Sequence, residues 1–193
     1  GTIFTGLFLL NPEVRRKCKK LFQDVVSGKF AKWQLLGGVA GAIYIATASS
    51  TVSIIGTGLF TVVLVASQNM SGIVVDRFGL SSGSRKKITP KRSIAAVIGI
   101  AAVLLSVTDF QGKILWIPIV AVVMAGVAVT VQFALNGRVT KAANSQVSAF
   151  INFPMSMITV CITLFVMNLF GKTWNTWPNQ WWLYTAGFLG AVV

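Results

Sequence analysis

The sequence predicts an all-α fold, a polytopic bundle of transmembrane helices, and three observations support this fold class. Hydrophobic residues make up 54% of the chain and charged residues only 11%, whereas a soluble domain has about a quarter charged residues. Lys and Arg lie between apolar runs, and all six tryptophans lie at the ends of those runs, where aromatic belts form. One block, Trp33–Tyr44, also returns near the end of the sequence as Trp182–Val193.

The two copies of this block indicate an internal repeat. They share a tryptophan, two glycines and an alanine at matched positions, namely Trp33/Trp182, Gly38/Gly187, Gly41/Gly190 and Ala42/Ala191. Each copy follows an apolar run and a connecting loop, so we expect two versions of one unit, residues 1–109 and 110–193. Residues 1 and 193 both fall within apolar runs, which favours an internal part of a longer protein in which each unit has further helices.

Apolar runs of sufficient length define the spans. A spanning helix needs roughly 20 mainly apolar residues. Five complete spans are predicted, together with two incomplete ones at residues 1–10 and 181–193; the complete ones are 33–50, 53–75, 93–109, 114–137 and 147–170. Ser49-Ser50-Thr51 is the expected turn between the first two complete spans.

Residues 11–26 are predicted to form an amphipathic helix within a basic segment, 11–32. Asn11 can cap this helix, Pro12 suits its first turn, and Glu13 suits the positive end of its dipole. Apolar residues recur on one face and basic residues cover the rest: Val14, Cys18, Leu21, Phe22, Val25 and Val26 against Arg15, Arg16, Lys17, Lys19 and Lys20. The helix is expected to lie in the headgroup plane against anionic lipid, and a solvated basic loop is the alternative.

Charge asymmetry orients the predicted bundle. If residues 11–32 lie on one side, five spans place residues 78–92 and 138–146 on the same side, and all seventeen Lys and Arg except Lys113 and Lys172 then lie there. That side is therefore expected to be cytoplasmic, in an inner or plasma membrane. Because an odd number of spans separates the two copies of the block, the copies face opposite ways, as in the inverted-topology repeats of secondary transporters.

Ionisable residues are missing from the middles of the predicted spans. Asp76 and Asp109 lie at span ends and are expected to be interfacial, so a carboxylate proton relay is not supported. The sequence has no histidine, and Cys18 and Cys161 fall in different environments, so no metal, cofactor or disulfide is expected. These absences argue against an enzyme.

Neutral polar residues instead form stripes on three spans. The candidates for a substrate path are Gln68, Gln132, Asn136, Asn152, Ser156 and Thr159, and the stripes also include Thr57, Thr61 and Thr163. They could line a water-filled cavity, or they could act as hydrogen-bonding glue between helices. Pro154 is expected to kink its span beside Asn152, which makes 147–170 the best candidate for a moving element. Small residues are expected to bring helix backbones close together at Gly37, Gly38, Gly41, Gly187 and Gly190.

Four short motifs follow one another along the chain: Gly37-Gly38-x-x-Gly41-Ala42-Ile-Tyr44, then Gln68 with Asp76-Arg-Phe-Gly79, then Gln132-Phe-Ala-Leu-Asn136-Gly, then Trp181-Trp182 before Gly187 and Gly190. In order and spacing, the chain resembles the YdcZ-type branch of the drug/metabolite transporter superfamily. It departs from the family pattern at Ser67, where glycine is frequent, and at Arg77, where histidine is frequent. The resemblance implies five-helix units, either doubled to ten helices or paired as a homo- or heterodimer, and a transport class without a defined substrate.

We therefore expect a secondary transporter or exporter of small metabolites or drug-like solutes that works by alternating access. The rival interpretation is a membrane-embedded structural or assembly subunit without a translocation path. An intramembrane enzyme ranks below both. The net charge of +13 would suit a nucleic-acid partner, but the bilayer explains the position of the charges better, so the expected partners are anionic lipid and an unidentified small molecule.

Overall fold

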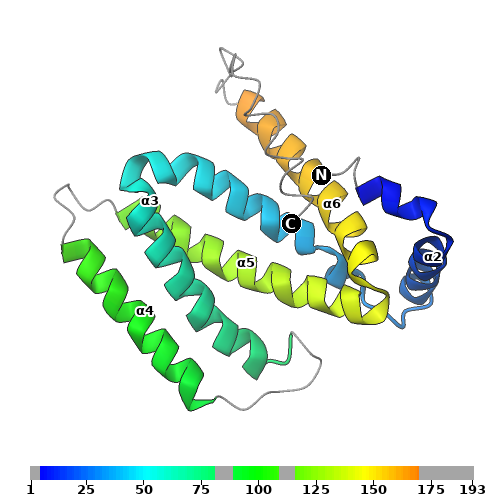
Figure 1. The fold of residues 1–193 in the computed structure, drawn as a ribbon. Helices are drawn as coiled ribbons and strands as arrows, with labels where there is room; N and C mark the ends of the chain where they lie inside the picture. Colours follow the sequence, from blue (N-terminus) through cyan, green and yellow to red (C-terminus); the bar gives the residue numbers. More distant parts are fainter. Residues whose placement is uncertain (1–4, 81–88, 109–115, 170–193) are drawn as a thin grey trace. The chain divides into compact units, whose positions relative to one another are not determined.

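The computed structural model describes residues 5–80, 89–108 and 116–169, and within them the chain forms helices and turns without a strand (Figure 1). The elements in chain order are η1 Leu7–Leu10, α2 Pro12–Val26, η2 Lys32–Leu35, α3 Gly37–Arg77, α4 Pro90–Thr108, α5 Trp116–Ala142 and α6 Ser145–Leu169. The all-helical class is confirmed. The second copy of the repeated block, with Gly187 and Gly190, lies outside the described residues, so the inverted repeat and the division at residue 109 stay predictions.

Three of these helices, α3, α5 and α6, are long and apolar enough to cross a membrane, with mean hydropathies of 1.8, 2.2 and 1.9. Helix α4 has an apolar stretch, Ser93–Ser106, that is shorter. Spans were predicted at all of these positions. The chain is therefore an integral membrane protein built from apolar helices.

Helix α3 is a pair of helices joined by a break at Gly56. Its 41 residues would extend about 60 Å as one helix, which is roughly twice the thickness of a hydrocarbon core. Gly56 has φ 77° and ψ 157°, a conformation open to glycine, and it leaves about 20 residues on each side, enough for one crossing each. The region in which two spans were predicted therefore contains two helical halves, each long enough for one crossing.

The predicted turn between those spans, Ser49-Ser50-Thr51, is in the wrong place, because the backbone there is helical. The hydroxyls of Ser49 and Thr51 donate to the carbonyls of Ile45 and Thr47, four residues earlier, at 2.7 and 2.6 Å. Such bonds satisfy a serine or threonine within its own helix. These residues therefore do not interrupt an apolar helix, whereas Gly56 does.

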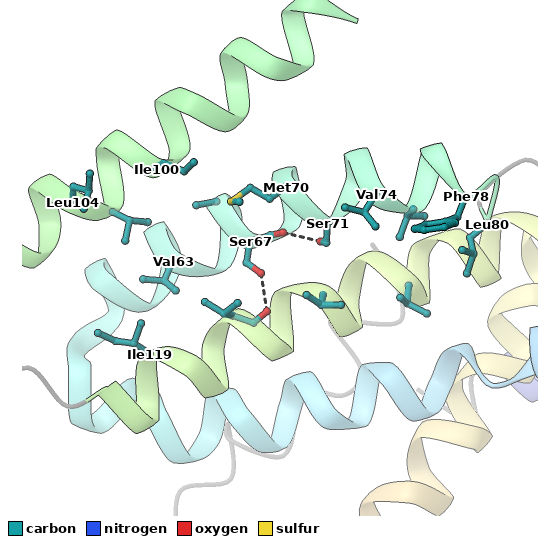
Figure 2. A pocket seen from close by; sticks show the side chains of 16 residues that line it. Val63, Ser67, Met70, Ser71, Val74, Phe78, Leu80, Ile100, Leu104 and Ile119 are labelled. Carbon is teal, nitrogen blue, oxygen red and sulfur yellow. Dashed lines mark hydrogen bonds between the residues drawn. The ribbon is translucent and has the colours of Figure 1, made fainter. Parts of the chain in front are cut away.

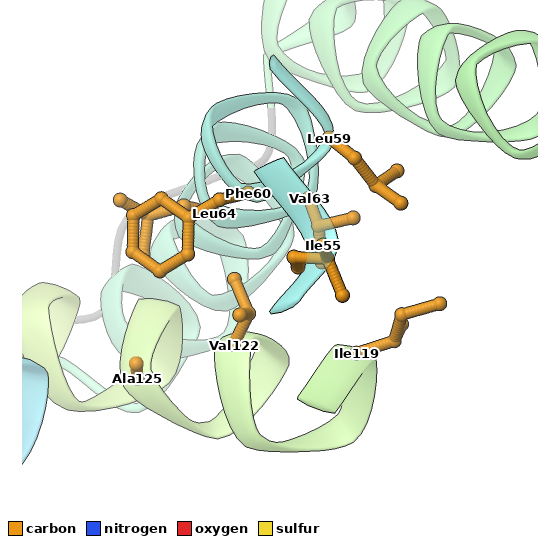
Figure 3. Packing of buried hydrophobic residues seen from close by; sticks show 8 residues of the cluster. All are labelled: Ile55, Leu59, Phe60, Val63, Leu64, Ile119, Val122 and Ala125. Carbon is orange, nitrogen blue, oxygen red and sulfur yellow. The ribbon is translucent and has the colours of Figure 1, made fainter. Parts of the chain in front are cut away.

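The described helices belong to two compact units, one comprising Gly1–Gly38 and Val139–Val193 and the other Val39–Arg138. The core of the second unit joins both halves of α3 to α5. Figure 3 shows its buried members, which are Ile55, Leu59, Phe60, Val63, Leu64, Ile119, Val122 and Ala125. Tyr44, Ala48 and Val52, from the first half of α3, pack against this cluster.

The core of the other unit is built on the apolar face of α2. The start of α2 follows the prediction, since the Asn11 side chain accepts a hydrogen bond from the Glu13 amide at 2.9 Å and Pro12 occupies the first turn. Val14 and Leu21 are almost completely buried, in one cluster with Val139 and Val147. The apolar stripe is thus largely covered by protein, and only Phe22 and Val26 of the stripe remain exposed.

Two titratable groups on α2 have shifted pKa values. The Lys17 ammonium, 2.7 Å from the Glu13 carboxylate, donates a hydrogen bond that lowers the pKa of Glu13. Burial raises the pKa of the Cys18 thiol. Both cysteines are free, with Cys18 buried and Cys161 exposed.

Helix α3 ends in a turn that α5 holds in place. The amides of Gly79 and Leu80 donate back to the carbonyls of Asp76 and Val75, and Gly79 has φ 69°, which together make a Schellman motif. The Arg138 guanidinium donates to the carbonyls of Gly79 and Leu80 at 2.8 and 2.6 Å. Asp76 lies at the helix end as expected, but its side chain is buried, not exposed at the interface.

Candidate functional site

Small residues bring the second half of α3 against α5. A Cβ added to Gly126 would lie 2.6 Å from the Ser67 Cβ, so the two helices touch where Gly126 has no side chain. The Ser67 hydroxyl donates to the Val123 carbonyl at 2.7 Å. One turn on, Ser71 donates to the Thr130 hydroxyl at 2.8 Å, and Thr130 donates to the Gly126 carbonyl at 2.9 Å. These polar groups act as glue between helices.

Gln132 connects α5 to the first half of α3. Its side-chain amide lies over Gly41, where an added Cβ would be 2.6 Å from the Gln132 Nε2 atom. Gln132 is half-buried, and its amide makes no hydrogen bond to another described residue. The glycine of the repeated block therefore provides the space for the Gln132 amide.

The other two path candidates in this unit are Gln68 on α3 and Asn136 on α5. Gln68 and Asn136 are both half-buried. The main-chain carbonyl of Gln68 lies 3.4 Å from the Thr130 hydroxyl, so Gln68 is part of the α3–α5 contact. Thr57 and Thr61, on the predicted stripe with Gln68, are exposed, and the Thr61 hydroxyl is satisfied by the Thr57 carbonyl.

An apolar groove of about 630 Å³ lies between the second half of α3, α4 and α5 (Figure 2). Its walls are aliphatic and aromatic except for Ser67 and Ser71, whose hydroxyls already donate to the Val123 carbonyl and the Thr130 hydroxyl. A volume in this range holds a drug-sized molecule. The groove favours an apolar molecule, because a water there would find few free polar partners.

Helix α6 makes a close backbone contact with Gly38. A Cβ added to Gly38 would collide with the Asn152 carbonyl oxygen and would lie 2.7 Å from the Ser156 amide nitrogen. The Ser156 hydroxyl donates to the Gly38 carbonyl at 2.8 Å. Two path candidates, Asn152 and Ser156, are thus brought to the first turn of α3, and Ser156 serves as interhelical glue.

Asn152 carries the most unusual polar atom among the described residues. Its Oδ1 atom is buried and has no hydrogen-bond partner. The residue lies two positions before Pro154, which has no amide hydrogen and so frees the Phe150 carbonyl within α6. A buried amide oxygen without a partner costs about 1–3 kcal/mol, so its presence in a membrane helix calls for a functional reason.

Further along α6, the threonines of the predicted stripe hydrogen-bond to the backbone of their own helix. The Thr159 hydroxyl donates to the Met155 carbonyl at 2.8 Å, and Thr163 donates to the Thr159 carbonyl at 2.9 Å. Thr159 is half-buried and is satisfied locally. The stripe therefore contains three different environments, with one amide oxygen without a partner, one interhelical bond and two bonds within the helix.

The sequence interpretation missed two features. The pairing of Ser67 and Ser71 with Gly126 and Thr130 was overlooked, although both pairs have the four-residue spacing of one helix face. The role of Arg138 was also missed, because it was counted only as a loop charge. No sequence signal predicts the contact of Arg138 with the turn, because the carbonyls of Gly79 and Leu80 are brought to its guanidinium only by the tertiary fold.

A comparison with family models finds one match, to a family described as "Putative inner membrane exporter, YdcZ", over residues 1–105 and 117–193. The chain matches no curated protein and no solved structure. The matched residues include every path candidate and both close-contact glycines, Gly38 and Gly41.

Proposed function

Because the chain belongs to the YdcZ family of inner membrane exporters, we propose that it is a secondary transporter that moves small metabolites or drug-like solutes by alternating access. The observation that carries this proposal is the buried, unpartnered Oδ1 atom of Asn152 beside Pro154. A membrane helix gains nothing in stability from such an atom. A solute that donates a hydrogen bond there during transport would satisfy it.

The path candidates of the other compact unit are Gln132, whose amide lies over Gly41, together with Gln68 and Asn136. Each of them is uncharged, as Asn152 is. We therefore expect a solute that is recognised through hydrogen bonds and not through an ion pair.

The inverted relation of the two copies of the repeated block is part of the proposal. In inverted-repeat transporters, one repeat rocks against the other repeat around a fixed substrate site. Pro154 supports a moving α6, because a freed carbonyl lowers the resistance of a helix to bending. The cytoplasmic position of the basic segment 11–32 belongs to the same proposal and follows from the charge bias.

The alternative, a structural subunit without a path, is favoured by the glue found at Ser67, Ser71 and Ser156. The structural-subunit interpretation does not explain the Asn152 Oδ1 atom, because a polar group that joins two helices needs a hydrogen-bond partner on the other helix. Transport therefore accounts for one more observation than the alternative.

The test compares two asparagines of the same helix. Asn144 caps α6 by accepting from the Val147 amide at 2.8 Å, whereas Asn152 Oδ1 accepts nothing. The full-length protein and its Asn144→Leu and Asn152→Leu variants would be reconstituted in vesicles loaded with a mixture of small neutral and anionic solutes. Release is followed by mass spectrometry, and stability is followed by thermal unfolding in detergent.

We expect Asn152→Leu to reduce release at least tenfold while its stability stays equal or rises. Asn144→Leu should lose about 0.5–2 kcal/mol, the cost of a removed cap, and keep its release per folded molecule. If Asn152→Leu transports normally, the site is wrong. If no solute is released by the parent protein under either direction of gradient, the structural subunit is the better interpretation.

A further inference from the structure

The apolar groove of the second unit is not used by the proposed path. Its long wall is α3, where the lining residues recur from Val63 through Met70 and Val74 to Phe78 (Figure 2). This stripe extends about 22 Å at the rise of an α-helix. Half of a hydrocarbon core is about 15 Å thick, so the groove is long enough for the acyl chain of one leaflet.

Among the described residues around the groove, the exposed charges lie at the end of α3 and the start of α4. Arg77 is exposed and follows Met70 and Val74 on the same helix face, at spacings of seven and three residues. Helix α4 runs antiparallel to this half of α3, so its exposed first-turn Lys91 belongs to the same end (Figure 1). From Val63 to Val74 on α3, and along the described wall residues of α4 and α5, the lining contains no charged side chain.

The Arg138 guanidinium shapes this charged end. By holding the Gly79 and Leu80 carbonyls, it fixes the turn that carries Phe78 and Leu80, both of which line the groove. The buried Asp76 carboxylate lies in the last turn of α3, so the exposed cations at this end are Arg77 and Lys91. An apolar channel that ends beside exposed cations is complementary to an anionic amphiphile, with its chain in the channel and its anion at the cations.

We propose that this groove is a binding site for an anionic phospholipid of the leaflet that faces the basic segments. One acyl chain occupies the groove between α3, α4 and α5, and the phosphate lies at Arg77 and Lys91. A zwitterionic lipid would also fill the groove, but its own headgroup cation would compensate its phosphate, so it would interact less favourably with Arg77 and Lys91. The proposal does not depend on which solute is transported, because the groove and the polar path have different lining residues.

Binding is tested on the full-length protein in mixed micelles, with dioleoylphosphatidylglycerol and dioleoylphosphatidylcholine as the probes. The two lipids have the same chains and differ in net charge. Affinity is read from the thermal shift as each lipid is titrated, and retained lipid is identified by native mass spectrometry. We expect at least tenfold tighter binding of the glycerol lipid by the parent protein.

Three variants locate the lipid-binding site. Arg77→Gln combined with Lys91→Gln should reduce the preference to below threefold, whereas Arg15→Gln combined with Lys19→Gln removes two exposed charges from α2 and should leave it above fivefold. Met70→Trp, at a side chain that is 47% exposed and lines the groove, should weaken binding of both lipids.

Three results would overturn the proposal. Equal affinity for the two lipids in the parent protein would show that the cations do not select a headgroup. Loss of preference only in the α2 pair would assign the lipid to the basic helix. A change from dimer to monomer in Met70→Trp, with lipid binding unchanged, would make the groove an interface between two copies of the chain.

Discussion

The contact between Gly38 and α6 provides the sharpest test of the tertiary arrangement within its unit. Gly38→Ala would place a methyl group against the Asn152 carbonyl oxygen, 2.7 Å from the Ser156 nitrogen and 2.8 Å from the Met155 Cβ. Contacts below 3.0 Å require something to move. Two of these three neighbours are main-chain atoms, so a side-chain rotation cannot relieve the collision, and α6 must move away from Gly38.

The expected cost follows from two losses. Overpacking of this kind costs about 1–3 kcal/mol. Displacement of α6 also lengthens the 2.8 Å bond from the Ser156 hydroxyl to the Gly38 carbonyl, and an interhelical hydrogen bond in a membrane is worth about 0.6 kcal/mol. Alanine is intrinsically better than glycine in a helix by up to about 1 kcal/mol, which offsets part of this cost. We expect a net loss of about 1–2.5 kcal/mol.

Gly72→Ala is the matched control. Gly72 is also a helical glycine of α3, but nothing lies within 4 Å of its added Cβ. This variant should be neutral or gain up to about 1 kcal/mol from helix propensity alone. Both proteins would be unfolded by heat or by a denaturing detergent in the same micelles, with circular dichroism as the readout.

A double-mutant cycle adds a second measurement. Ser156→Ala should cost less in the Gly38→Ala background than in the parent, because the hydrogen bond is already weakened there. If Gly38→Ala is as stable as Gly72→Ala, and if the effects of Gly38→Ala and Ser156→Ala simply add, then α6 does not lie on Gly38 and the reasoning is refuted.

Three further predictions concern other contacts and the topology. Gly41→Ala should lose less stability than Gly38→Ala, because its added methyl group meets the end of the flexible Gln132 side chain. Adding Gln132→Ala to the Gly41→Ala variant should recover most of the lost stability in a thermal unfolding assay. Cys18 should react with a water-soluble maleimide only slowly, and faster as the pH rises above the usual thiol range, since burial raises its pKa; rapid labelling at neutral pH would show that α2 is not packed as described. In a background without native cysteines, cysteine at Ser27 should be labelled only from the cytoplasm and cysteine at Thr57, beside the Gly56 break, only from the other side, and labelling of both from one side would contradict the orientation.

Local signals in the sequence were sufficient to predict where the helices lie. The start of α2 follows from Asn11, Pro12 and Glu13, because a cap, a first-turn proline and an N-terminal acid act on backbone groups within one turn. The presence of two helices between residues 33 and 75 also followed from length and hydropathy. The position of the break did not, because hydroxyl residues satisfy themselves inside a helix, and the choice of Gly56 over other glycines of the segment depends on where the two halves pack.

In the candidate site, the contacts of individual polar side chains could not be predicted from the sequence. Their spacing along the sequence correctly places three polar residues on one face of a helix, namely Asn152, Ser156 and Thr159. It could not show that Ser156 binds Gly38, that Thr159 bonds to its own helix, or that the Asn152 amide oxygen has no partner.

The same is true of α2, whose amphipathic pattern predicted a helix with one apolar face but not the surface that covers it. The sequence by itself determined which segments are helices and which face of each is polar, because hydropathy, caps and periodicity are properties of neighbouring residues. Only the tertiary structure decided which polar group meets which partner. Such contacts join residues such as Ser67 and Val123 or Gly41 and Gln132, far apart in the chain, and they depend on helix rotation and close approach that no local pattern specifies.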